Sequence, residues 1–144
     1  MSSLERAIEL AVQYHKGQLD KVGQPYILHP LRVMQRCQGV TAQMVAVMHD
    51  LLEDTPVTSE MLLGEGFSPE VVDGLLGVTR QKGESYRDFV LRSGRNPLSR
   101  QVKLADLEDN LDIRRLTGPL TAKDHQRLER YREAWHLLQA QPAG

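Results

Sequence analysis

The chain has 144 residues, of which 40% are hydrophobic and 26% are charged, and its formal net charge at pH 7 is -1. This length predicts a single domain over residues 1–144 with one buried core. The near-neutral charge gives no electrostatic reason to expect nucleic acid or an anionic membrane as a partner. A lone cysteine, Cys37, excludes an internal disulfide, and the sequence shows neither a membrane-spanning apolar run nor a signal-peptide core. We therefore expect a cytoplasmic protein, and the sequence indicates no particular oligomeric state.

Capping residues and apolar repeats predict helices along the whole chain, and no alternating strand pattern of useful length occurs. The first helix should begin at Ser2, which forms a capping-box pattern with Glu5. The helices are expected at residues 2–17, 30–38, 41–54, 58–63, from 68 onward, 85–93, 97–113 and from 121 onward. The predicted fold class is all-α.

The stretch from Met48 to Pro56 carries polar, chemically capable side chains in what the apolar pattern predicts to be a buried helix. In a continuous helix, His49 lies above Glu53 and Asp50 above Asp54, because residues four apart share a face. A helix end with solvated acids would explain Glu53 and Asp54, but not a His-Asp pair among apolar residues. Buried charge is costly, and a bound cation is one way to offset that cost, so the stretch favours a metal site.

Two further positions are able to complete such a site. In the helix expected from residue 97, Asp106 and Asn110 interrupt an apolar row of residues spaced four apart, which points an acid inward. His29 adds an imidazole at the start of the second helix. Together His29, His49, Asp50 and Asp106 supply two nitrogens and two carboxylate oxygens, a ligand set that suits Mn²⁺, Fe²⁺ or Zn²⁺.

The order His, His-Asp, Asp resembles the HD-domain metal-dependent phosphohydrolases, a family of helical enzymes. More narrowly, separated motifs across about residues 7–116 resemble the hydrolase domain of the RelA/SpoT homologue family. The motifs are Gly17-Gln18 with GQPYILHP at 23–30, HDLLEDT at 49–55, VTR at 78–80, and KLAD at 103–106 with Asn110.

This resemblance implies an HD helical bundle that holds one Mn²⁺ in its core. It also implies hydrolysis of the 3′-pyrophosphate of (p)ppGpp, the alarmone of the stringent response, to give GDP or GTP and pyrophosphate. The chain is too short to carry the family's nucleotide-synthesising domain as well, so it resembles a stand-alone small alarmone hydrolase.

By position, the resemblance also assigns roles to individual residues. It makes His29, His49, Asp50 and Asp106 the metal ligands. Glu53 and Asp54 match the acid pair that activates and orients the attacking water, and a carboxylate beside a metal is able to accept a proton from water. Lys21 matches a basic residue near the substrate phosphates, and Asn110 matches an amide that contacts the nucleotide.

Position 20 departs from the family pattern. Where the family has an arginine that stacks on guanine, this chain has Asp20, which cannot provide cation–π stacking and adds repulsion near an anionic ligand. The nucleotide base is therefore less firmly indicated than the reaction.

Two alternatives to the alarmone hydrolase remain open. One is an HD phosphatase that acts on another phosphorylated nucleotide or dinucleotide, such as NADPH. The other is an HD module that binds a nucleotide without turnover, although such a module has no need for the acids Glu53 and Asp54.

Overall fold

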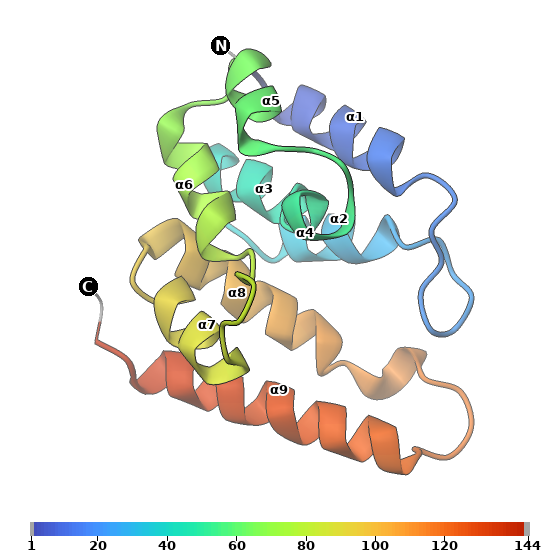
Figure 1. Cartoon of the computed structure of the whole chain (residues 1–144). Helices are drawn as coiled ribbons and strands as arrows, with labels where there is room; N and C mark the ends of the chain where they lie inside the picture. The colour runs from blue at the N-terminus through green and yellow to red at the C-terminus, as the bar shows by residue number, and fades with distance from the viewer. Residues whose placement is uncertain (1, 143–144) are drawn as a thin grey trace.

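The computed structural model describes residues 2–142, and over that range it is built from helices, with one isolated β-bridge and no strand (Figure 1). The helices are α1 (Leu4–His15), α2 (Leu28–Gln35), α3 (Val40–Val47), α4 (Leu51–Asp54), α5 (Ser59–Gly64), α6 (Pro69–Gly77), α7 (Tyr86–Ser93), α8 (Pro97–Asn110), the short 3₁₀ helix η1 (Ile113–Arg115) and α9 (Ala122–Ala140). The prediction of an all-α fold is confirmed. No helix of the described range is long and apolar enough to cross a lipid bilayer.

Side-chain caps fix most helix starts where the sequence predicts them. The capping side chains that accept a backbone N–H of the first turn include those of Thr58, Ser68, Ser85, Asn96 and Thr121. At α1 the predicted cap is wrong by one residue, since Ser3 accepts from the Arg6 N–H at 3.1 Å. Ser3 has the extended backbone that a cap requires, whereas the Ser2 N–H is bonded to the Gly66 carbonyl at 3.0 Å.

Four other helix ends differ from the prediction. The second helix spans residues 28–35 rather than 30–38, and the chain then turns through Gly39 at φ +90°, a backbone conformation that favours glycine. Gly39 rather than Thr41 precedes α3. The helix expected to reach residue 113 stops at Asn110, because the Asp112 side chain caps the separate 3₁₀ helix η1.

The continuous helix predicted through the His-Asp pair is wrong, because three residues between α3 and α4 form a turn. His49 Nδ1 donates to the Ala46 carbonyl at 2.7 Å, and the His49 N–H bonds to the same oxygen at 3.3 Å. In a continuous helix that carbonyl would instead accept from the Asp50 N–H. His49 thus lies outside both helices and does not stack above Glu53. Asp50 and Asp54 do keep helical spacing, since the Asp54 N–H bonds to the Asp50 carbonyl at 2.9 Å.

Helix α8 lies between two hydrophobic clusters and is packed on both sides. The larger cluster is formed mainly by α1, α2, α3 and α6, and it includes Val102 and Ala105 of α8. The smaller cluster consists of Val90, Leu107, Ala134 and Leu138, from α7, α8 and α9. Asp106 comes between Ala105 and Leu107, so the packing of both clusters fixes the position of its carboxylate.

Candidate metal centre

Two buried imidazoles from neighbouring elements meet in the interior. The ring centroids of His29, on α2, and His49 are 5.1 Å apart. A carbonyl only accepts, so the bond to Ala46 places a proton on His49 Nδ1 and directs Nε2 towards the carboxylates. Nε2 is buried and has no hydrogen-bond partner within residues 2–142, although Asp50 Oδ2 is 3.1 Å away without hydrogen-bond geometry. A buried nitrogen without a partner needs an explanation, and a metal ion is one.

A carboxylate behind His29 orients its ring. His29 Nδ1 lies 2.7 Å from Asp109 Oδ2, and His29 Nε2 lies 3.0 Å from Asp106 Oδ1. Asp109 is fully buried and also accepts from Arg32 Nε at 2.9 Å. Burial would raise the pKa of Asp109, but the bonds from His29 and Arg32 lower it to about 2. The ionised Asp109 therefore fixes the proton on His29 Nδ1, the arrangement common behind metal-binding histidines.

Asp106 provides the acid that the sequence analysis expected from the third element of the site. Its Oδ1 lies 3.0 Å from His29 Nε2 and 3.6 Å from His49 Nε2. Its other oxygen, Oδ2, accepts from the buried ammonium of Lys103 at 3.1 Å. Asn110, one turn along α8, donates to Oδ1 at 3.1 Å. Both oxygens are thus held in place, and Oδ1 faces the two imidazoles.

Asp50 completes the group, from the end of the turn that follows α3. Its Oδ2 accepts from the hydroxyl of Tyr26, whose pKa is raised by burial first and by Asp50 second, so the phenol stays protonated. One candidate ligand atom each from His29, His49 and Asp50 lies within 4.8 Å of the others. The structure therefore groups three of the residues that the sequence analysis named as metal ligands, and the fourth, Asp106, lies next to the two imidazoles of that group.

The carboxylates of this group attract positive charge. Burial would lower the pKa of His29, but the bonds to Asp106 and Asp109 raise it. Burial likewise opposes the charged form of His49, yet the nearby Asp50 and Asp106 hold its pKa well above the usual value. The carboxylates thus favour positive charge on both imidazoles. A divalent cation would supply that charge, and nitrogens with carboxylate oxygens separated by about 3 Å suit ligands that share one ion.

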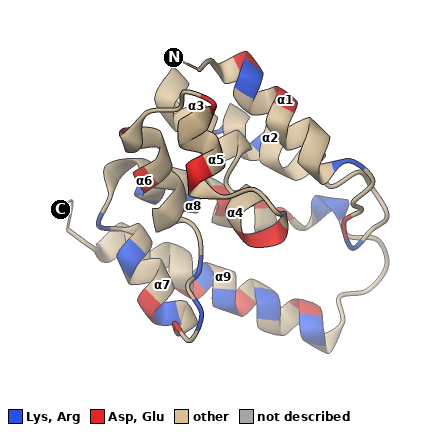
Figure 2. Ribbon diagram, turned by 45° about the horizontal axis from the view of Figure 1, so that its top comes forward, with Lys and Arg blue, Asp and Glu red and all other residues tan. Residues whose placement is uncertain are grey.

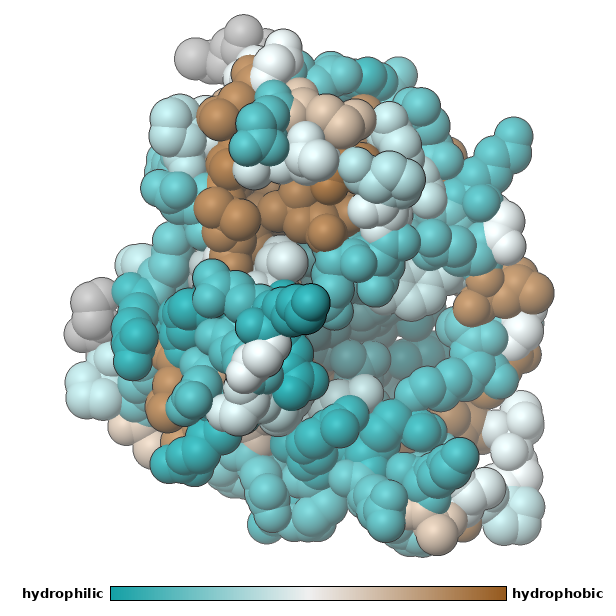
Figure 3. All heavy atoms as spheres, viewed as in Figure 1, coloured by the Kyte–Doolittle hydropathy of each residue, from teal (hydrophilic) through white to brown (hydrophobic). Residues whose placement is uncertain are grey.

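Two cavities lie on either side of the candidate metal centre, between α9 and the helices above it. The loop-side cavity, of about 200 Å³, is lined by residues that include Asp20, Lys21, His29, Arg32 and Arg127. The α4-side cavity, also of about 200 Å³, is lined by residues that include Asp50, Glu53, Arg80, Tyr86, Asp106 and Arg130. Asn110 and Tyr131 line both cavities. Figure 2 shows the acidic residues of α4 above the alternating charges of α9, and Figure 3 shows a recess of hydrophilic residues between these two parts.

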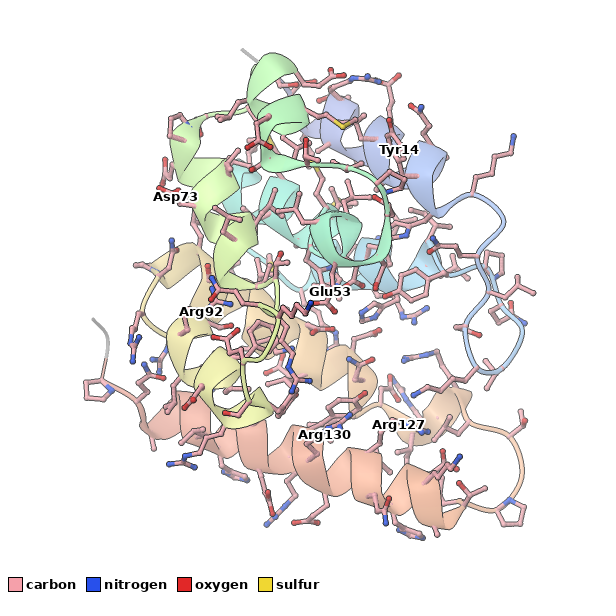
Figure 4. All side chains as sticks on the ribbon, viewed as in Figure 1. Tyr14, Glu53, Asp73, Arg92, Arg127 and Arg130 are labelled. Carbon is pink, nitrogen blue, oxygen red and sulfur yellow. The ribbon has the colours of Figure 1, made fainter. Side chains whose placement is uncertain are left out.

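The two acids of α4 occupy different positions. Glu53 lines the α4-side cavity, and its Oε1 accepts from the backbone N–H of Arg80 at 2.9 Å, which leaves Oε2 available (Figure 4). Asp54 does not line either cavity within residues 2–142, although both acids belong to exposed residues. Partial desolvation of the Asp54 carboxyl group, followed by the charges of Asp50 and Glu53, raises its pKa to about 6. The structure therefore places Glu53, rather than the pair, closest to the space where a substrate would bind.

The loop between α1 and α2 places Lys21 and Asp20 at the loop-side cavity. Burial is the main cause that lowers the pKa of Lys21, and the charge of Arg127 on α9 adds to it. Both cations line this cavity. The Asp20 carboxylate also closes the loop, because its Oδ1 accepts from the N–H groups of Val22 at 3.0 Å and Gln24 at 2.9 Å. The residue that departs from the family pattern is thus part of the loop's own structure.

Sequence analysis missed the residues that support the ligands. Asp109 follows Asp106 by three residues, Lys103 precedes it by three, and Tyr26 precedes His29 by three. Residues three apart in a helix lie next to each other on one face. This spacing from Asp106 was the signal in the sequence that could have indicated Asp109 and Lys103. The contact between Tyr26 and Asp50 joins elements that are distant in sequence, and no local pattern indicates it.

Comparisons with known proteins find relatives by sequence, although no family model matches the chain. It is 35% identical over 132 residues to a probable GTP pyrophosphokinase of Mycobacterium leprae, a match that covers 83% of this chain. It is 34% identical over 120 residues to the guanosine-3′,5′-bis(diphosphate) 3′-pyrophosphohydrolase of Aquifex aeolicus, covering 75% of this chain. It is 29% identical over 142 residues to the bifunctional (p)ppGpp synthase/hydrolase SpoT of Escherichia coli, covering 88% of this chain. The matches span only 17%, 17% and 20% of these three relatives.

A solved structure shares the fold over nearly the whole chain. It is described as that of a metazoan ortholog of SpoT that hydrolyzes ppGpp, and it superposes with a TM-score of 0.79 at 22% identity. The alignment covers 99% of this chain and 89% of the other. The helical arrangement around the candidate centre is therefore that of a known fold.

The hydrogen bonds of Asp20 predict that Asp20→Ala loosens the loop between α1 and α2. Each lost bond is worth about 0.5–1.5 kcal/mol, so hydrogen exchange at the Val22 and Gln24 amides should accelerate by about two- to tenfold. Asp20→Asn keeps an oxygen acceptor and should stay near the wild type. Equal protection in the alanine variant and the wild type would show that the carboxylate does not hold the loop.

Proposed function

We propose that this chain, a RelA/SpoT-type HD domain by sequence similarity and fold, removes the 3′-pyrophosphate of guanosine tetra- or pentaphosphate, releasing pyrophosphate and GDP or GTP. The observation that carries the proposal is the convergence of His29, His49, Asp50 and Asp106 in a buried group that is short of positive charge. This group lies between two cavities whose walls supply cations for phosphate groups.

The proposal includes a divalent metal as cofactor, Mn²⁺ in first place, with Fe²⁺ and Zn²⁺ as alternatives. The residues fit such an ion, because His49 Nε2 is buried without a hydrogen-bond partner among the described residues and both histidines have their Nδ1 protons fixed from behind. A bound ion would stabilise negative charge on a phosphoryl group and ease the deprotonation of a nearby water.

The protein's own groups have separate parts in this proposal. Glu53 is the base, because it lines the cavity and the Arg80 N–H holds one of its oxygens while the other is free to accept a proton. Asp54, with a pKa of about 6, follows Glu53 in α4 and is the second acid of the proposed pair, which orients the attacking water. Lys21 and Asn110 bind the nucleotide, and Asn110 lines both cavities next to Asp106.

One alternative substrate class has a specific observation in its favour. Asp20 brings a negative charge to the loop-side cavity, where a guanidinium would favour stacking on guanine. A phosphatase that acts on another nucleotide or dinucleotide, such as NADPH, would use the same metal centre and release orthophosphate instead of pyrophosphate.

A product assay tests the proposed function. The Mn²⁺-loaded protein is incubated with guanosine tetraphosphate, other 3′-phosphorylated nucleotides and NADPH, and the released pyrophosphate and orthophosphate are measured separately. We expect pyrophosphate from guanosine tetraphosphate, and Asp50→Asn, which loses a candidate metal ligand, should release none. Orthophosphate alone would favour the alternative, and no product from any nucleotide would favour a binding module without turnover.

The placement of Glu53 predicts that Glu53→Gln retains metal but loses most of the rate, by about 100- to 10,000-fold, as is typical for a positioned acid–base group. The amide preserves an acceptor for the Arg80 N–H, so the local structure should persist. Metal content and kcat are measured on the same preparation. Loss of metal together with the rate would mean that Glu53 is a ligand and that its role is assigned wrongly.

The hydrogen bond behind His29 predicts that Asp109→Asn weakens metal binding by about 10- to 100-fold, which is typical for the loss of such a partner. Asp112→Asn is the matched control, since Asp112 pairs with Arg114 at 2.8 Å and is close to Asp109 in sequence. Affinity is measured by competition with a metal chelator, and folding by circular dichroism. If both variants bind metal as the wild type does, Asp109 does not support the site.

A further inference from the structure

Most cations that line the two cavities are already engaged with the protein. Lys103 pairs with Asp106 at 3.1 Å, Arg32 with Asp109 at 2.9 Å, and the Arg80 guanidinium donates to the Glu84 carbonyl at 3.0 Å. Arg115 and Arg127 also have carboxylate partners. Within residues 2–142, the exceptions are Lys21 and Arg130, whose charged groups form no hydrogen bond or ion pair with the protein. Lys21 is a nucleotide-binding residue in the proposed function, whereas Arg130 has no role in it.

Aromatic rings hold Arg130 in position without using its hydrogen-bond donors. Its Cζ lies 5.0 Å from the ring centroid of Tyr86, on α7, and 5.7 Å from that of Tyr131, on α9. A cation–π contact uses none of the N–H donors of the guanidinium, so these groups stay available to a ligand. Figure 4 shows Arg130 and Arg127 projecting from α9 towards the space below α4, with Glu53 on the other side.

Two further cations lie near the Tyr86 ring in the same wall of the cavity. Lys103 Nζ lies 5.8 Å from its centroid and Arg80 Cζ lies 5.9 Å from it, and all of these residues line the α4-side cavity. This wall also includes Asp50 and Glu53, the candidate ligand and the candidate base. An anionic group at the metal centre would therefore meet Arg130 as the cation that has no competing partner.

We propose that Arg130, supported by Tyr86 and Tyr131, binds the diphosphate group of the substrate in the α4-side cavity and retains it as pyrophosphate after cleavage. A planar guanidinium matches two oxygens of a phosphate, and a diphosphate offers several such pairs. In the reaction, the bond between the ribose 3′-oxygen and phosphorus breaks, a bond from that phosphorus to the water oxygen forms, and the ribose oxygen takes up a proton. Arg130 binds the phosphorus-containing product and takes no part in the proton transfer.

A cation at this position would also discriminate between substrates that carry a diphosphate and substrates that carry a monophosphate. A substrate with a single phosphate at this position lacks the second phosphoryl group that reaches beyond the metal centre. Arg130 should therefore favour diphosphate over monophosphate leaving groups. This inference rests on the proposed function for the reaction, whereas the binding of pyrophosphate can be measured without turnover.

The test compares Arg130→Gln, Arg130→Lys and Arg132→Gln with the wild type. Arg132 is the matched control, since it lies on the same helix, is exposed and pairs with Glu129 at 3.2 Å. Pyrophosphate and orthophosphate are titrated into each protein by calorimetry at a fixed concentration of free Mn²⁺. Thermal melting confirms that each variant is folded.

We expect Arg130→Gln to raise the Kd for pyrophosphate by about tenfold or more, the usual effect of losing a charge-assisted hydrogen bond. Its effect on orthophosphate should be much smaller. Arg130→Lys should be intermediate, because it keeps the charge but loses the planar pair of donors. Arg132→Gln should bind like the wild type. In steady-state kinetics on guanosine tetraphosphate, Arg130→Gln should raise KM more than it lowers kcat.

The two proposals fail in different ways. If Arg130→Gln binds pyrophosphate as tightly as the wild type does, or if Arg132→Gln weakens binding equally, the role of Arg130 is refuted whatever the substrate is. If pyrophosphate binding depends on Arg130 but guanosine tetraphosphate is not cleaved, the proposed function is wrong and the diphosphate site stands.

Discussion

The structure depends on the burial of two carboxylates on one face of α8. Asp106 and Asp109 are buried between hydrophobic clusters, where an unpaired negative charge would be strongly unfavourable. Each carboxylate is compensated by specific donors, Lys103 and Asn110 for Asp106, and Arg32 with His29 for Asp109. At the centre, the same carboxylates raise the pKa of both histidines, so positive charge is favoured there. A divalent cation is the partner that we propose for this group.

The helices around α8 explain how the carboxylates stay in place. One side of α8 packs on the large cluster and the other on the small cluster, so its axial position and rotation are both fixed. The turn between α3 and α4 then presents His49 and Asp50 to Asp106, because His49 closes the turn through its own ring nitrogen. The His49 side chain thus both closes the turn after α3 and faces the candidate metal centre.

Most of the fold and the four candidate ligands could be predicted from the sequence, for physical reasons that are local. Hydroxyl and amide side chains mark helix starts because they cap N–H groups only two or three residues further along the chain. A His-Asp pair in an apolar stretch favours a metal site because buried charge is costly without a partner. The prediction of a continuous helix through that pair was wrong because the His49 side chain bonds to the Ala46 carbonyl, which ends the helix despite the apolar periodicity. The bond from Tyr26 to Asp50 and the contact of Arg130 with Tyr86 join elements 24 or more residues apart, which local patterns do not encode.

In the proposed metal centre, one divalent cation compensates these carboxylates. The test is to grow crystals with Mn²⁺ and to measure diffraction at a wavelength where manganese scatters anomalously. We expect one strong anomalous peak enclosed by His29 Nε2, His49 Nε2, Asp50 and Asp106. The absence of a peak at saturating Mn²⁺, Fe²⁺ and Zn²⁺, or a peak bound only by exposed acids elsewhere, would contradict it.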